Sequence, residues 1–107
     1  MNLFSFQYTA LPSTVFFGEK SFDEVFKLLG HYKKVFVIAA NRQVNYVKDL
    51  QDRLGADRIV HFNQVVQHVP VDLIKTARQK QLEEQTDVLI AIGGGSAIGL
   101  AKALALE

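Results

Sequence analysis

No cysteine occurs among the 107 residues, so the sequence encodes no disulfide, no thiolate metal site and no cysteine nucleophile. This absence is typical of a reducing compartment, and we expect a cytoplasmic protein. Net charge is nearly absent as well, because 12 Lys and Arg residues face 11 Asp and Glu residues. The densest basic cluster is Lys33-Lys34, which is too small for a phosphate-binding surface, so we expect no nucleic-acid partner.

The sequence has neither the pattern of a signal peptide nor that of a membrane-spanning helix. Residues 1–17 lack the positively charged start and the continuous apolar stretch of a secretory signal. The apolar segment 88–106 is long enough to span a bilayer, but Gly93, Gly94 and Gly95 interrupt it. We therefore expect a buried strand followed by a separate helix, and no membrane partner.

The N-terminal part of the chain has the pattern of a β-hairpin followed by a helix. The β-prone segments 3–8 and 15–17 flank Pro12, which predicts an antiparallel pair. Ser21 and Glu24 then have the spacing of a capping box, which predicts the start of a helix. Apolar residues at helical spacing continue this helix to a glycine stop, at Phe22, Val25, Phe26, Leu29 and Gly30.

Three unbroken apolar runs, each followed by a helical pattern, make up the rest of the chain, without repeats or linkers. Such runs are typical of strands buried on both faces of a parallel sheet, and right-handed crossovers then place helices on both faces. The predicted fold is α/β, a doubly wound parallel (Rossmann-like) sheet with an N-terminal β-hairpin, formed by residues 1–107 as one domain. The predicted strands cover 35–40, 58–62 and 87–92, and the predicted helices run from Asn41 to Gly55, Pro70 to Gln85 and Ala97 to Leu106.

Ligands of such a sheet bind beyond the carboxyl ends of its strands, where loops lead into helices. The segments in those places are 39–42, 63–70 and 93–96. The last reads Gly93-Gly94-Gly95-Ser96, and glycines before a helix let a phosphate approach the N–H groups at the positive end of that helix. Ser96 adds a hydroxyl for a phosphate oxygen. The alternative is a tight turn in which glycine permits close packing and Ser96 only caps the helix.

Better-known motifs fail at single positions of this turn. A G-x-G-x-x-G dinucleotide motif from Gly93 and a G-x-S-x-G nucleophile elbow around Ser96 would both need glycine at Ile98. A Walker loop ending at Gly99 would need lysine at Leu100. The histidines are not spaced as metal ligands either, so we expect no metal site from this chain. One histidine, at position 68, lies in a predicted ligand-facing loop, where contact with a ligand and simple solvent exposure are both open.

The segment 91–102, with the sequence AIGGGSAIGLAK, resembles the nucleotide-binding turn of the iron-containing alcohol dehydrogenase superfamily. Segments 6–8, 11–12 and 15–18 are similar to the N-terminal hairpin of that family, so the resemblance covers essentially the whole chain. Many members have aspartate at the position of Gly99, and asparagine before the proline that corresponds to Pro70. This chain has Gly99 and Val69 at these two positions, and both differences resemble the maleylacetate reductase branch.

The resemblance implies a nicotinamide-dependent oxidoreductase that transfers hydride. In this interpretation Gly93-Gly94-Gly95-Ser96 holds the pyrophosphate of NAD or NADP. Lys102 lies near the cofactor, or else is a solvated surface charge. In the family an aspartate at the end of the first core strand selects NAD, whereas Ala40 and Asn41 stand here, so no carboxylate would repel a 2′-phosphate. Asn41 is thus a further cofactor-binding candidate, and its minimum role is a helix N-cap.

The resemblance also implies an all-helical C-terminal domain that supplies the metal ligands and most of the substrate pocket. The sequence stops at Glu107 inside an apolar helix, so we expect the cofactor half of a longer enzyme. That half would bind a nicotinamide dinucleotide without turnover, and any metal would bind only through the missing domain. Hairpins of this family contribute to dimer contacts, which implies a homodimer. The alternative is a non-catalytic α/β domain that binds a nucleotide or a partner chain.

Overall fold

The computed structural model describes residues 6–10, 13–17, 22–66, 69–93 and 95–105. Its strands are β1 (Phe6–Ala10), β2 (Ser13–Phe17), β3 (Val35–Ala39), β4 (Ile59–Phe62) and β5 (Val88–Ile92). Its helices are α1 (Phe22–Leu29), α2 (Val44–Leu54), α3 (Val71–Glu84) and α4 (Gly95–Ala105), with short 3-10 turns η1 (Asn41–Gln43) and η2 (Ala56–Arg58).

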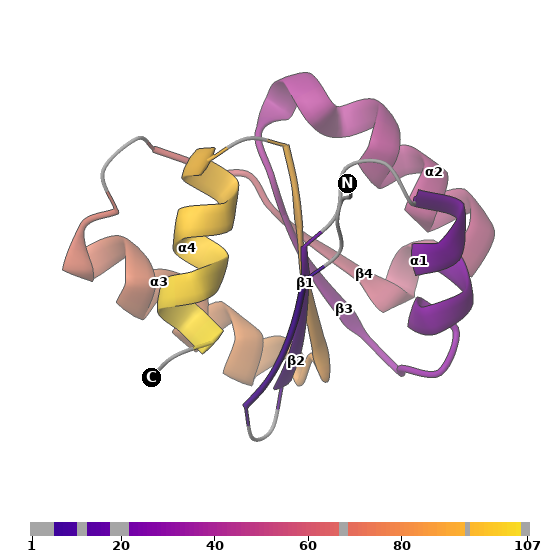
Figure 1. The fold of residues 1–107 in the computed structure, drawn as a ribbon, viewed down its shortest axis with the longest axis horizontal. Helices are drawn as coiled ribbons and strands as arrows, with labels where there is room; N and C mark the ends of the chain where they lie inside the picture. The colour runs from indigo at the N-terminus through magenta and orange to yellow at the C-terminus, as the bar shows by residue number, and fades with distance from the viewer. Residues whose placement is uncertain (1–5, 11–12, 18–21, 67–68, 94, 106–107) are drawn as a thin grey trace.

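The strands form one sheet in the order β1-β2-β5-β3-β4. The hairpin strands β1 and β2 are antiparallel, whereas β2, β5, β3 and β4 are mutually parallel. Seen along the sheet, α1 and α2 cover one face and α3 and α4 cover the other (Figure 1). The predicted doubly wound α/β fold is therefore confirmed. The hairpin also extends the parallel sheet, because β2 lies beside β5.

Each face of the sheet has its own hydrophobic core, and the alternation of strand residues explains why. Side chains of β3 point to opposite faces in turn, so Val35 and Val37 pack with α1 and α2, while Phe36 and Ile38 pack with α3 and α4. All five residues of β3 are fully buried. Burial on both faces is the physical reason for the unbroken apolar runs in the sequence.

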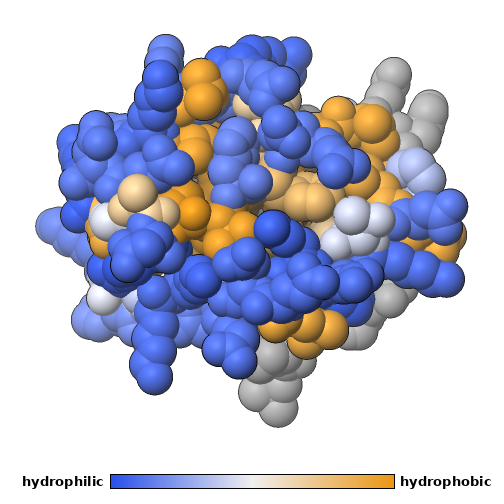
Figure 2. Space-filling view, turned by 180° about the vertical axis from the view of Figure 1, so that it is seen from behind, coloured by the Kyte–Doolittle hydropathy of each residue, from blue (hydrophilic) through white to orange (hydrophobic). Residues whose placement is uncertain are grey.

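Hydrophilic side chains cover most of the surface turned away from the viewer in Figure 1, with hydrophobic atoms showing between them (Figure 2). Strands β1 and β4 form the two edges of the sheet, and β1 is the edge nearer the viewer in Figure 1. Figure 2 therefore shows the molecule from the β4 edge. None of the described helices is long and apolar enough to cross a membrane.

Several element boundaries differ from those predicted. Helix α4 begins at Gly95, two residues before the predicted start. The prediction excluded Gly95 because glycine has a low helix propensity. Asn41 does not cap the following helix, so this prediction was wrong: Ala40 holds the cap position of η1, and Asn41 is the first residue of that turn. The predicted capping residue Ser21 and the predicted strand residues 3–5 lie outside the described residues.

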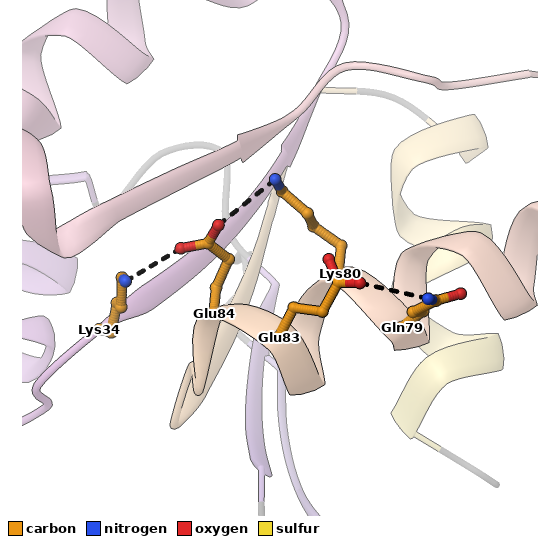
Figure 3. Close-up of polar contacts among 5 residues, drawn as sticks. All are labelled: Lys34, Gln79, Lys80, Glu83 and Glu84. Atoms are coloured by element: carbon orange, nitrogen blue, oxygen red, sulfur yellow. Dashed lines mark hydrogen bonds and ion pairs between the residues drawn. The ribbon is translucent and has the colours of Figure 1, made fainter.

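Polar groups at the amino edge of the sheet are bound to other protein groups. Asp87 accepts hydrogen bonds of 2.9 Å from the backbone N–H groups of Lys33 and Lys34. Glu84 pairs with Lys34 at 3.0 Å and with Lys80 at 3.4 Å (Figure 3). The guanidinium of Arg58 donates to carbonyl oxygens of Leu29, Tyr32, Lys33 and Leu54. The side chains of Asp87, Glu84 and Arg58 therefore have a structural role, since their polar groups already have partners.

Candidate functional site

The carboxyl ends of β3 and β5 meet where the strand order reverses. From β3 the chain proceeds to β4 on one side, and β5 then returns to the other side of β3. Ala39 is paired with Ile92, so the turns that follow these two strands leave the sheet at the same level. In open α/β sheets, such a switch point is the usual place for a ligand.

A cavity of about 60 Å³ lies at this switch point. Residues from all three segments predicted to face a ligand line it, so these loops meet at one place. The volume is well below the ~300 Å³ of a usual small-molecule site. The cavity can therefore receive one end group of a ligand, while a longer ligand would continue over the open edge. The lining residues are Ala40, Arg42, Gln43, Val65, Ile92, Gly93, Ser96 and Ala97.

Gly93 begins the turn after β5 and occupies a conformation that side chains rarely adopt, with φ of +119°. A Cβ at this position would lie 3.5 Å from both Cγ and Nε2 of Gln43. The turn thus needs glycine for its backbone angle, since side chains are strained at this φ. Gly94, also predicted to bind the cofactor, lies outside the described residues.

The start of α4 brings backbone donors to the cavity. The N–H groups of the first helical residues, from Gly95 through Ala97, have no acceptor within the helix, and the helix dipole makes this end positive. Ser96 is half-buried and lines the cavity as the second residue of α4. This position lies past the cap, so the interpretation of Ser96 as a helix cap does not fit the observed helix start.

The electrostatics of the cavity favour an anion. Arg42 contributes a cation, and none of the described residues that line the cavity is acidic. In the described part of the chain, the side chains of Arg42 and Gln43 form no hydrogen bond or ion pair. This contrasts with Arg58 at the amino edge, whose donors are bound to backbone carbonyl groups. The side chains of Arg42 and Gln43 are therefore available to a ligand.

The other predicted site residues lie around the cavity or away from it. Asn41 sits between two lining residues, but its own Oδ1 accepts a 2.9 Å hydrogen bond from Nδ2 of Asn63. Lys102 is exposed on α4 and does not line the cavity. His68 lies outside the described residues. Across the described ranges, no three His, Asp or Glu side chains are grouped to hold a metal ion.

A larger groove of about 330 Å³ runs between β4 and α3. Its polar groups are mostly paired within the protein: His61 Nε2 contacts the Ala39 carbonyl oxygen at 2.7 Å, and Gln79 donates to Glu83 at 3.2 Å (Figure 3). Asn63 is bound to Asn41, as described above. The groove thus offers fewer free donors to an anion than the smaller cavity does.

Sequence reasoning missed Gln43 as a lining residue. Val65 lay inside a predicted loop, and Gln43 directly follows the segment 39–42, so extending that segment by one residue would have included it. The contact of Gln43 with Gly93 depends on β3 lying beside β5, which the sequence pattern does not encode.

The family model for iron-containing alcohol dehydrogenase matches residues 12–107. Among curated relatives, a maleylacetate reductase of Sphingobium indicum is 37% identical over 103 residues, which cover 95% of this chain and 29% of that protein. The chain therefore spans about 29% of the length of this relative.

Solved structures give the same result. An iron-containing alcohol dehydrogenase from Corynebacterium glutamicum superposes with a TM-score of 0.67 at 33% identity, covering 98% of this chain and 30% of that one. A maleylacetate reductase from Agrobacterium tumefaciens superposes with a TM-score of 0.68 at 29% identity, covering 97% of this chain and 30% of that one. The chain belongs to the iron-containing alcohol dehydrogenase family and has maleylacetate reductases among its homologues.

Proposed function

We propose that residues 1–107 form the nicotinamide-dinucleotide-binding part of an NAD(P)-dependent oxidoreductase of the maleylacetate reductase type. Membership of the iron-containing alcohol dehydrogenase family supports an oxidoreductase. The observation that carries the proposal is the cavity at the switch point, which Arg42 lines together with Ser96 and Ala97 of α4; none of the described lining residues is acidic. This arrangement suits a negatively charged ligand group.

In this proposal the diphosphate of the cofactor sits over Gly93-Gly94-Gly95-Ser96. The absence of a Cβ at Gly93 allows close approach, and the free N–H groups of the first turn of α4 donate to phosphate oxygens. Ser96 adds its hydroxyl as a donor. The rest of the dinucleotide extends along the open edge, since the cavity of about 60 Å³ takes only one group of it.

NADP as well as NAD fits the residues after β3. Ala40 and Arg42 line the cavity there and Asn41 lies between them, so this turn carries no carboxylate. A 2′-phosphate would meet the Arg42 guanidinium rather than a like charge. Asn41 and Lys102 are further cofactor contacts in this proposal. Lys102 does not line the cavity, but its long exposed side chain can move to reach the cofactor.

We propose that substrate binding and metal binding belong to the part of the relatives' chains that this sequence does not match. NAD(P)H supplies the hydride in such enzymes, and no three His, Asp or Glu side chains are grouped to hold a metal ion among the described residues. We therefore propose that this chain binds the dinucleotide without turning over a substrate by itself. A homodimer formed through the N-terminal hairpin and a cytoplasmic location complete the proposal.

Titration of the purified chain with NADH and with NADPH tests the proposal. Ser96→Asp should weaken both affinities at least tenfold, because its carboxylate would stand beside the diphosphate. The fold should persist, since aspartate is favourable in the first turn of a helix. Ala56→Asp, an exposed position at the amino end of β4, should bind like the wild type. Absence of binding by the wild type, or equal binding by Ser96→Asp, would refute the proposal.

A further inference from the structure

Gln43 lies across the switch point from Gly93, and its side chain is directed toward the place that a Cβ of this glycine would occupy. It is the last residue of η1 and the cap residue of α2, yet its side chain makes no capping hydrogen bond. Instead, its Cγ and Nε2 lie 3.5 Å from the position that a Cβ of Gly93 would occupy. A half-buried side chain from the β3 side thus lies beside the turn that follows β5.

The amide group of Gln43 has unused hydrogen-bonding capacity. A glutamine amide carries two N–H donors and a carbonyl acceptor. Within the described residues no protein group bonds to this amide, although it lines the same cavity as Ser96. A partly buried amide is more stable when its hydrogen bonds are made, so a ligand or water must supply them.

We propose that Gln43 is a ligand-binding residue that donates from Nε2 to the diphosphate of the bound dinucleotide. This inference rests on the proposed function. It adds a contact from the β3 side to the donors that α4 provides from the β5 side, so the anion is held by two elements. Arg42, the neighbouring residue, supplies the charge that attracts the anion to this side of the cavity.

Two substitutions separate the hydrogen bond from the packing. Gln43→Met keeps the length of the side chain and its packing on Gly93 but removes the amide. Gln43→Lys keeps a donor and adds a positive charge. Gln51→Lys makes the same charge change at a half-exposed position in the last turn of α2 and serves as the control. Each variant is titrated with NADH and with inorganic pyrophosphate, after circular dichroism has confirmed its folding.

We expect Gln43→Met to weaken both ligands about tenfold, the effect of losing a hydrogen bond to a charged group. Gln43→Lys should bind as tightly as the wild type or more tightly, with a steeper dependence on salt, and Gln51→Lys should change affinity less than twofold. Should Gln43→Met not fold, Gln43→Lys decides, because weaker pyrophosphate binding at low salt would overturn the inference.

The outcomes also separate this inference from the proposed function. Wild-type affinity in Gln43→Met, together with loss of binding in Ser96→Asp, would overturn the role of Gln43 and leave the glycine turn in place. Equal loss in Gln43→Met and Gln43→Lys would show that Gln43 acts through packing alone. Absence of NADH and pyrophosphate binding in the wild type would overturn both proposals.

Discussion

Asn63 donates a hydrogen bond of 2.9 Å from its side-chain amide to Oδ1 of Asn41. The bond joins the loop after β4 to the turn after β3, beside the cavity at the switch point. Both residues are exposed, so the bond does not depend on burial of either side chain. An aspartate at position 41 could accept the same hydrogen bond, which allows the charge of this turn to be changed while its conformation is kept.

Asn41→Asp should therefore shift the preference of the chain from NADPH towards NADH. The new carboxylate repels a 2′-phosphate but can accept hydrogen bonds from ribose hydroxyls, and we expect the ratio of the two dissociation constants to change about tenfold. Titration with both reduced cofactors measures this ratio. Asn45→Asp, one turn further along the chain on α2, should change it less. An unchanged ratio in Asn41→Asp would show that the ribose lies elsewhere.

Two glycines of the last strand-helix unit should respond oppositely to alanine. Gly93 has a φ of +119°, so Gly93→Ala should lower the free energy of unfolding by about 1–3 kcal/mol. Gly99 lies inside α4, and a Cβ there would meet Val69 Cγ2 at 3.8 Å, an ordinary contact. Gly99→Ala should therefore raise the free energy of unfolding by about 0.5–1 kcal/mol through helix propensity. Urea denaturation measures both, and the same sign for both variants would contradict the geometry of the turn.

Much of the fold could be predicted because its causes are local. The buried runs of β3 and β5 and the glycine turn between β5 and α4 are visible in single segments of sequence. The position of β2 beside β5 was not predicted, since it depends on which strand edge the hairpin meets. The site follows the same division. Ser96 lies in a local motif, whereas the contact between Gln43 and Gly93 joins residues fifty positions apart and exists only because β3 and β5 are neighbours.

The ion pairs of Glu84 predict how stability changes in acid. Hydrogen bonds from Lys34 and then from Lys80 hold the pKa of Glu84 below its ordinary value, while burial opposes this weakly (Figure 3). The pKa is lower in the folded state than in the unfolded state, so the stabilisation is complete above the unfolded value and is lost as pH falls through the folded value. Glu84→Gln should therefore flatten the loss of stability below about pH 5, where carboxylates titrate.

Denaturation midpoints measured between neutral and acidic pH check this effect, which should be small because Glu84 is partly exposed. Lys34 is the larger cause, so Lys34→Met should remove more of the pH dependence than Lys80→Met. A larger effect of Lys80→Met would contradict the order of the two ion pairs.

The most direct test of the account is a nuclear magnetic resonance titration of the nitrogen-15-labelled chain with NADH. If the diphosphate binds at the start of α4, the backbone amide signals of Gly95, Ser96 and Ala97 should shift most and should saturate together. Signals along the groove between β4 and α3 should stay nearly constant. Saturable shifts confined to that groove, with unchanged signals at the start of α4, would contradict the central claim.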